Sequence, residues 1–259
     1  MMADMIQLFP VKCGKQTENF PLVECILSSI TKNGLKLEDD DILAISSKFV
    51  AMSEGRIVKL SSIKAGEKAK AIARKLKMKP EMAQLVLDEA EKVFSGVENF
   101  VLAIKDGMIA PNAGIDKSNV YPSHAILYPK NAFTAAERIR NEIYKRTRKK
   151  IGVVLTDSRL MPTRIGTTGI AVAVSGFEPV QNCIGKRDLF GNKLKYTKRA
   201  LADDIAAAAQ LLMGETDEAI PVVIVRAKNL QWRYMDRKVS RKEMVIDWRK
   251  DIYIRGLSR

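Results

Sequence analysis

The sequence of 259 residues contains one histidine, His124, and only three cysteines. A single imidazole excludes every metal site built on a pair of histidines, and we assign His124 no catalytic role. Three cysteines cannot form a disulfide framework, and none lies at the spacing of a metal knuckle. The longest apolar stretches, such as residues 169–176, are far shorter than the ~20 residues that a membrane span needs. Because no basic-then-apolar signal begins the chain, we expect a soluble, cytoplasmic protein.

The common nucleotide-binding fingerprints are also missing. No Gly-x-Gly-x-x-Gly occurs, and neither Gly14-Lys15 nor Gly185-Lys186 has the flanking residues of a P-loop. No Gly-x-Ser-x-Gly nucleophile elbow is present. Phosphate chemistry in this protein therefore needs another arrangement, for which carboxylates that hold a divalent metal are the natural choice.

Positive charge is abundant. Lysine and arginine number 44 against 30 acidic residues, which gives a net charge of +14. This balance favours anionic partners, namely nucleic acid, phosphorylated small molecules or an anionic membrane, without choosing among them. A nucleic-acid-binding protein is one alternative, but the sequence contains no helix-turn-helix signature, zinc module or aromatic RNP stretch. We therefore expect a small-molecule partner and no nucleic acid.

Runs rich in Ile and Val alternate with helical patterns, which predicts an α/β (mixed α+β) fold with central sheets flanked by helices. The predicted strands are Asp41–Val50, Phe100–Ile104, Ile151–Thr156, Gly169–Ser175 and Pro221–Val225. The predicted helices are Glu67–Lys77, Pro80–Phe94, Thr134–Lys150 and Arg199–Met213. We expect two lobes, although no linker marks a boundary between them.

The C-terminal tail, residues 227–259, is basic and differs from the rest. It is predicted to be a solvated helical extension, a subunit arm or an anion-binding flap. The first is favoured because runs of charge usually mark faces exposed to water. We therefore divide the chain into a domain at 1–226 and an extension at 227–259.

Two loops carry carboxylates beside other oxygen donors. In residues 111–120, Asp116 and Asn119 lie three apart among small residues that let a backbone approach a ligand. The alternative, a turn in which they only satisfy backbone amides, is favoured for this loop alone. Asp157 and Ser158 follow a predicted strand and offer hard oxygen ligands for Mg or Mn. Asp157 as a helix N-cap is an equal alternative.

A third acidic loop follows the alanine-rich helix. Glu215, Asp217 and Glu218 repel one another at a helix C-terminus, and a bound cation would relieve that repulsion. A solvated loop is the competing interpretation, since water and salt also screen these charges. Three basic residues near glycines are candidate contacts for an anionic substrate: Arg164, Lys186 and Arg187. Each is equally well explained as a surface charge.

Taken in order, these stretches resemble the coenzyme F-420-0:γ-glutamyl ligase family. The resemblance lies in SEGRI (Ser53–Ile57), NAGIDKSNV (Asn112–Val120), IGVVLTDS (Ile151–Ser158), Arg164 with Gly166, IGKRDLFGNKL (Ile184–Leu194) and LADDIAAAAQLLMGETDEAIPVVIVR (Leu201–Arg226). It spans most of the chain, and NAGIDKSNV together with the MGETDE loop is its most specific part.

This resemblance implies a GTP-dependent ligase that forms an intertwined homodimer and adds L-glutamate to the carboxylate of a deazaflavin phospholactate through an acyl phosphate. It implies two divalent ions, Mg or Mn, and a monovalent cation such as K. The residues that match the family's metal ligands are Asp116 and Asp157 for one ion, and Ser158 and Glu215 for the other. The residues that match its nucleotide contacts are Ser47, Asn119, Met213, Gly214, Thr216, Asp217 and Glu218.

The chain departs from the family pattern at three places. Leu160 and Met161 stand where the family usually has Gly-Arg, and Met52 stands where a lysine is common. Residues 13–16 match the family's early apolar nucleotide loop poorly. Such losses of cationic contacts suggest a related ligase with a different carboxylate acceptor as the main alternative. A ligase-like scaffold that binds nucleotide without turnover is a weaker one.

Overall fold

The computed structural model describes residues 5–17, 19–227, 232 and 234–257, and it is built around a mixed five-stranded sheet. In spatial order the strands are β1 (Ile6–Val11), β12 (Val222–Ala227), β2 (Ile42–Ser46), β8 (Gly152–Leu160) and β9 (Thr167–Ser175). Only β2 and β8 pair in parallel, and the other neighbours are antiparallel. The predicted α/β architecture with a central sheet is therefore confirmed.

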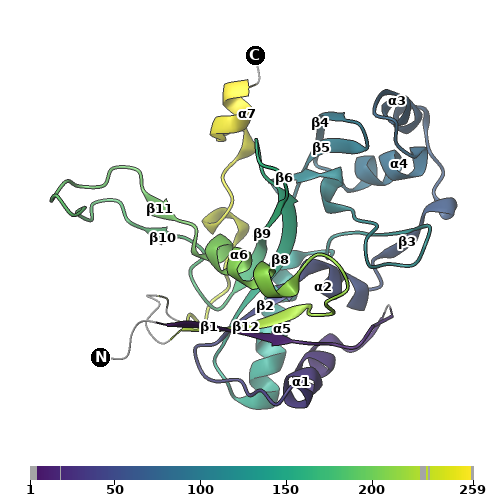
Figure 1. Ribbon diagram of the computed structural model, residues 1–259. Helices are drawn as coiled ribbons and strands as arrows, with labels where there is room; N and C mark the ends of the chain where they lie inside the picture. The colour runs from purple at the N-terminus through teal and green to yellow at the C-terminus, as the bar shows by residue number, and fades with distance from the viewer. Residues whose placement is uncertain (1–4, 18, 228–231, 233, 258–259) are drawn as a thin grey trace.

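Helices cover both faces of this sheet, as Figure 1 shows with the sheet nearly edge-on. The helices α1 (Leu22–Lys32) and α5 (Ala132–Thr147) lie on one face, and α6 (Leu201–Met213) lies on the other. Because side chains alternate along a strand, Leu43 and Ile45 of β2 enter the first core while Ile42 and Ala44 enter the second. This burial on both faces explains why the strands are nearly continuous apolar runs.

Residues 54–127 form a second group of elements between β2 and α5, at the upper right of Figure 1. The group contains the short pair β3 (Ile57–Lys59) and β7 (His124–Ile126), the helices α3 (Glu67–Lys75) and α4 (Pro80–Glu89), and the sheet of β4 (Lys92–Val97), β5 (Phe100–Lys105) and β6 (Met108–Pro111). It has its own buried apolar cluster. Whether it acts as a separate lobe stays a prediction.

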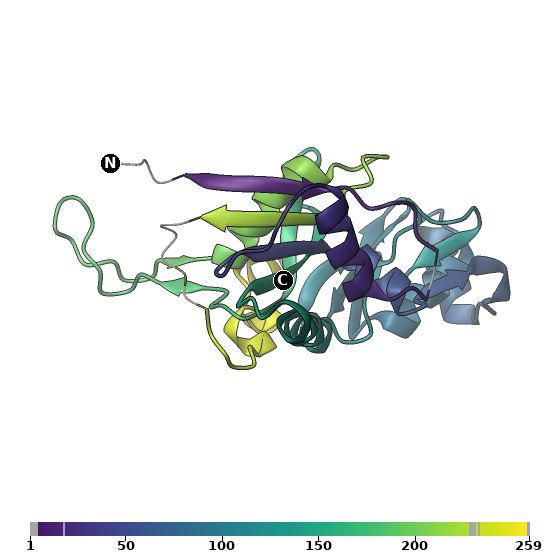
Figure 2. The ribbon, with the colours of Figure 1, turned by 90° about the horizontal axis from the view of Figure 1, so that it is seen from below.

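A long arm extends from the body between β9 and α6, at the left of Figures 1 and 2. Its base is the pair β10 (Gln181–Asn182) and β11 (Lys198–Arg199). Toward its end, the side chains of Leu189 and Phe190 are 100% and 91% exposed. Across the described residues, no helix is long and apolar enough to cross a membrane.

The C-terminal tail runs over the body. Trp232 packs edge-on against Phe177, which is buried in the core beneath α6, with 5.9 Å between the ring centres. Trp248 packs edge-on against Phe94 of β4, with 5.5 Å between the ring centres. The described tail therefore contacts both groups of elements through aromatic side chains, while its basic residues Arg237, Lys238, Arg241 and Lys242 are exposed to water as predicted. Its regular structure comprises the 3-10 turns η3 (Arg241–Glu243) and η4 (Trp248–Lys250) and the helix α7 (Ile252–Leu257). Residues 228–231, 233 and 258–259 of the predicted extension lie outside the described chain.

Two predicted elements end earlier than expected. The strand predicted over Asp41–Val50 stops at Ser46, and α2 (Ser47–Ser53) follows at once. The helix predicted over Pro80–Phe94 stops at Glu89, because Ala90 is extended and β4 then pairs with β5. At the first boundary buried apolar side chains continue from Ile45 to Phe49, so apolar content alone did not locate it.

Candidate functional site

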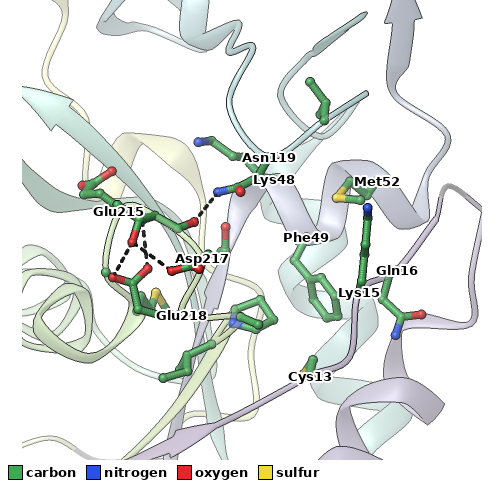
Figure 3. A pocket seen from close by; sticks show the side chains of 18 of the residues that line it. Cys13, Lys15, Gln16, Lys48, Phe49, Met52, Asn119, Glu215, Asp217 and Glu218 are labelled. Atoms are coloured by element: carbon green, nitrogen blue, oxygen red, sulfur yellow. Dashed lines mark hydrogen bonds between the residues drawn. The ribbon is translucent and has the colours of Figure 1, made fainter. Parts of the chain in front are cut away.

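A pocket of about 680 Å³ opens where β2 ends, β8 passes and β12 begins. Its walls come from three loops far apart in sequence, residues 13–16, 119–122 and 213–221. Figure 3 shows Glu215, Asp217 and Glu218 on one side of the pocket, with Lys15, Gln16 and Met52 on the other. The pocket therefore gathers the third acidic loop, part of the first, and the early loop that matched the family pattern poorly.

Asp157 lies within β8, on the pocket wall. Ser47 Oγ donates to its Oδ1 at 3.4 Å, and the Tyr128 hydroxyl donates to its Oδ2. Burial raises the pKa of this carboxyl above its ordinary 3.8, against the opposing effects of Tyr128 and Lys48. Because β8 continues to Leu160 and no helix begins here, the alternative of Asp157 as an N-cap is wrong.

Asp116 is held in a turn next to the pocket. Its Oδ1 accepts from the backbone N–H groups of Lys117 and Ser118, at 2.5 and 2.8 Å, as the turn interpretation predicted. Its Oδ2 also forms an ion pair with Lys48, which itself lines the pocket. Burial raises the pKa of Asp116, but Lys48 and the bonds from Ser118 outweigh it and hold the pKa below 3.8. Asp116 thus has both a turn role and a cation partner.

The third acidic loop begins where Gly214 ends α6. Gly214 has a φ of +66°, which favours glycine, and a Cβ there would push against the Glu218 carboxyl group, whose carbon would lie 2.1 Å away. Glu218 folds back onto Thr216, whose backbone N–H donates to it at 2.8 Å. Glu215 accepts from Thr167 Oγ1 at 2.7 Å and from Gln210 Nε2 at 2.8 Å. The loop is therefore ordered by its own polar contacts.

The charges on the pocket wall suit a cation. Four carboxylates line it, from Asp157, Glu215, Asp217 and Glu218, against two ammonium groups, from Lys15 and Lys48. In addition, burial raises the pKa of Asp157 above its ordinary value, and a bound cation would favour its charged form. With the Ser158 hydroxyl these groups are hard oxygen donors, which fit Mg or Mn. Among the described residues, however, no three His, Cys, Asp or Glu side chains converge on one point.

The predicted site residues divide into three sets. Those that line the pocket are Asp157, Ser158, Glu215, Asn119 and the loop from Met213. Ser47 and Asp116 lie beside the pocket, Ser47 bonded to Asp157 and Asp116 in the adjacent turn. The predicted cations do not line it: Arg164 lies in the turn after β8, and Lys186 and Arg187 lie on the arm. Their substrate role stays a prediction.

Several polar residues in or beside the pocket were not predicted as site residues. Lys15, Lys48 and Gln210 line the pocket, and Tyr128 bonds to Asp157 from behind the wall. For Gln210 a signal was present, because it lies four residues before Gly214 on the helix that leads into the acidic loop. The other three become recognisable only through contacts between distant segments.

Comparison with known proteins bears on this site directly. The family model described as F420-0:Gamma-glutamyl ligase matches residues 10–227, a range that contains all the loops of the pocket. The chain belongs to the F420-0:gamma-glutamyl ligase family. Similar proteins are the coenzyme F420:L-glutamate ligases of Methanocaldococcus jannaschii, 40% identical over 75% of this chain and 78% of the relative, and of Archaeoglobus fulgidus, 35% identical over 92% and 94%. That of Methanosarcina mazei is 36% identical over 89% and 90%. The resemblance read from the motifs is therefore confirmed for the family.

Proposed function

We propose that this chain is a GTP- and divalent-metal-dependent ligase that joins L-glutamate to the carboxylate of coenzyme F-420-0. The acidic wall of the pocket is the observation that carries the proposal. Four carboxylates against two ammonium groups would repel a triphosphate, so a nucleotide can bind here only with cations that neutralise the wall. Membership of the ligase family supports the reaction, and the names of its relatives support the substrates.

In this proposal Asp116 and Asp157 hold one divalent ion, and Ser158 and Glu215 hold the second. The ions, Mg or Mn, would neutralise the triphosphate and align it for phosphoryl transfer. An ammonium group and a metal ion on the same oxygens repel each other, so Lys48 would release Asp116 and become available to the phosphates. A monovalent cation such as K is a further proposed component.

The residues of this chain would then bind and orient the reactants. A carboxylate is a poor electrophile, so an oxygen of the acceptor carboxylate would first attack the γ-phosphorus of GTP, which breaks the bond to the β–γ bridging oxygen, releases GDP and forms an acyl phosphate. The amine of L-glutamate would attack the acyl carbon, form the amide bond and release phosphate. Asn119 and the backbone of residues 213–220 would hold the nucleotide, and Lys15 would provide positive charge on the opposite wall.

One observation favours a second candidate with a different acceptor. Leu160 and Met161, in place of the family's usual Gly-Arg, are 43% and 42% exposed. Exposed apolar side chains would suit an acceptor with less negative charge than a phosphodiester. A related amide-forming ligase for another carboxylate is therefore the alternative.

We also propose that the ligase works as a homodimer. The arm extends away from the body (Figure 2), and its exposed Leu189 and Phe190 near the end and Tyr196 near the base suit burial against another subunit. Light scattering after size-exclusion chromatography should give twice the chain mass. The variant Phe190→Ser should shift the protein toward monomer, and a wild-type monomer would contradict the proposal.

Mass spectrometry tests the reaction. After incubation with the deazaflavin phospholactate, L-glutamate, GTP and Mn, the acceptor should gain the mass of a glutamyl residue. No gain with folded protein, together with a gain on another carboxylate, would favour the second candidate. Thermal stabilisation by GTP with Mn should also exceed that by ATP with Mn.

The variant Asp157→Asn tests the metal site. It should abolish the GTP-dependent activity and the stabilisation by Mn while leaving the fold intact, because it weakens a ligand at constant volume. Asp88→Asn, on the exposed face of α4, is the matched control and should retain both. Full activity of Asp157→Asn would remove this residue from the proposed site.

A further inference from the structure

Tyr128 holds Asp157 from the side away from the pocket. Its side chain is buried, with 3% of the residue exposed, and its hydroxyl donates to Asp157 Oδ2. Ser47 Oγ donates to the other oxygen, Oδ1, at 3.4 Å. Each oxygen of this carboxylate therefore has a hydroxyl partner, and the two partners come from segments 81 residues apart, the start of α2 and the segment after β7.

Tyr128 is itself fixed by two contacts. Its carbonyl accepts from Arg56 Nε at 3.1 Å, and Glu89 holds the Arg56 guanidinium through both carboxylate oxygens at 2.9 Å. Its ring packs on Gly114, where a Cβ would lie 2.4 Å from the ring atoms. Gly114 belongs to the loop that carries Asp116, so the same ring contacts that loop and reaches the strand that carries Asp157.

A hydroxyl at this position is not required for packing. Phenylalanine would fill nearly the same space, and burying a hydroxyl costs free energy unless it finds a partner. The partner found is a carboxylate on the pocket wall rather than a backbone group. Gly114, in the loop of small residues, leaves room for this tyrosine ring.

We propose that Tyr128 is a positioning residue: it fixes the orientation of the Asp157 carboxylate, and its ring sets the place of the Asp116 loop relative to β8. The inference rests on the proposed function, in which Asp157 and Asp116 bind a divalent cation. Hydrogen bonds to a ligating carboxylate hold its oxygens toward the ion, and loss of such a partner typically weakens metal binding ~10–100-fold.

The test uses the full chain and Mn alone. Isothermal titration with Mn, without nucleotide, should show ~10–100-fold weaker binding to Tyr128→Phe than to wild type. Circular dichroism and thermal unfolding without metal establish that the variant is folded. Tyr144→Phe, which removes a partly exposed hydroxyl on α5, is the matched control and should bind Mn like wild type.

A second substitution separates positioning from simple stability. Gly114→Ala pushes against the Tyr128 ring and should weaken Mn binding in the wild-type background. In the Tyr128→Phe background its further effect should be smaller, because the part that displaces the hydroxyl from Asp157 is already lost, while the push on the ring and the backbone strain at a φ of +75° remain. A purely structural role would lower the unfolding temperature of the metal-free protein and leave the Mn affinity of folded protein unchanged.

The outcomes are distinct. If wild type binds Mn and Tyr128→Phe binds it within about twofold, the positioning role is wrong while the proposed function stands. If wild type does not bind Mn with or without GTP, the proposed function fails, and the role of Tyr128 fails with it.

Discussion

Asn119 Nδ2 donates a hydrogen bond to the backbone carbonyl of Thr216 at 3.0 Å, across 97 residues of sequence. The bond joins the turn that follows Asp116 to the acidic loop that carries Glu215. It therefore holds the segment with one proposed metal ligand, Asp116, next to the segment with another, Glu215. Asn119 has a φ of 54°, in a region where asparagine is favoured over most other residues.

We expect Asn119→Gly to weaken nucleotide binding about tenfold, the value of one lost hydrogen bond of average strength. Glycine tolerates the positive φ, so the backbone should remain unstrained. The measurement is the Kd for GTP in the presence of Mn. Asn99→Gly, another asparagine at positive φ but in the turn between β4 and β5, is the control. Equal effects from both variants would contradict a specific role for Asn119.

Lys15 offers a test of the opposite wall. No hydrogen bond or ion pair engages its ammonium group in the described part of the chain, and it lines the pocket together with Met52, where the family often has a lysine. We expect Lys15→Met to weaken GTP binding roughly 10–100-fold, because a bond between charged groups is lost. Adding Met52→Lys should restore much of that affinity.

Titration calorimetry with GTP and Mn measures both variants. Lys12→Met removes an exposed lysine that does not line the pocket, and GTP affinity should be unchanged. If Lys15→Met binds GTP as wild type does, Lys15 is only a surface charge at the rim.

Much of the central sheet was predictable because β2, β8, β9 and β12 are buried on both faces, whereas β1 is mostly exposed and was not predicted. Ile- and Val-rich runs identified β5, β8, β9 and β12 within a few residues, and the alanine-rich run identified α6. The prediction was wrong where a buried helix directly follows a buried strand, as at Ser46 and Ser47. Both elements need apolar residues there, so composition does not separate them.

The site was harder to predict from the sequence than the fold. For Asp116 alone, the turn interpretation was the favoured one, and its backbone bonds are present. Only the family resemblance linked Asp116 with Asp157 and Glu215. Tyr128 follows an apolar run and carries no local signal, since its hydroxyl meets Asp157 through the fold. Contacts of this kind depend on how distant segments pack, which periodicity does not encode.

Glu89 predicts a pH dependence of stability. Its carboxylate accepts from Arg56 and from Lys105 at 2.9 Å. Burial raises the pKa of Glu89, but the bonds from Lys105 and Arg56 outweigh it, so the pKa lies below its ordinary 4.5. A lowered pKa means that the charged form stabilises the fold above about pH 4.5, and that this contribution is lost as the pH falls through the folded value.

We therefore expect Glu89→Gln to lower the free energy of unfolding by about 1–3 kcal/mol at neutral pH, because two cations lose their partner. The difference from wild type should shrink as the pH is lowered from about 4.5. Urea denaturation over a pH series measures it. Glu67→Gln, on an exposed glutamate of α3 paired only with Lys70, should change the midpoint far less at every pH, because water screens an exposed ion pair. A difference for Glu89→Gln that does not vary with pH would contradict the assigned ion pairs.

Arg140 holds the C-terminal tail against the main sheet. This arginine of α5 is 4% exposed, and it donates to Ser175 Oγ at 2.9 Å, to the Tyr234 hydroxyl at 2.5 Å and to Asp236 at 3.1 Å. Its guanidinium also lies 5.6 Å from the centre of the Tyr234 ring. A planar fork can serve these partners together, whereas the single ammonium of lysine cannot.

We expect Arg140→Lys to lower the free energy of unfolding by about 1–3 kcal/mol and to accelerate tryptic cleavage within the tail. Arg138→Lys is the control, since Arg138 lies on the same helix, is half exposed and contacts Glu54 instead of the tail. Urea denaturation gives the stability, and mass spectrometry of timed digests gives the cleavage sites. If Arg140→Lys is destabilised but its tail is cleaved no faster than in wild type, Arg140 stabilises the core without holding the tail. If both variants behave like wild type, the edge-on contacts of Trp232 and Trp248 are sufficient to fix the tail.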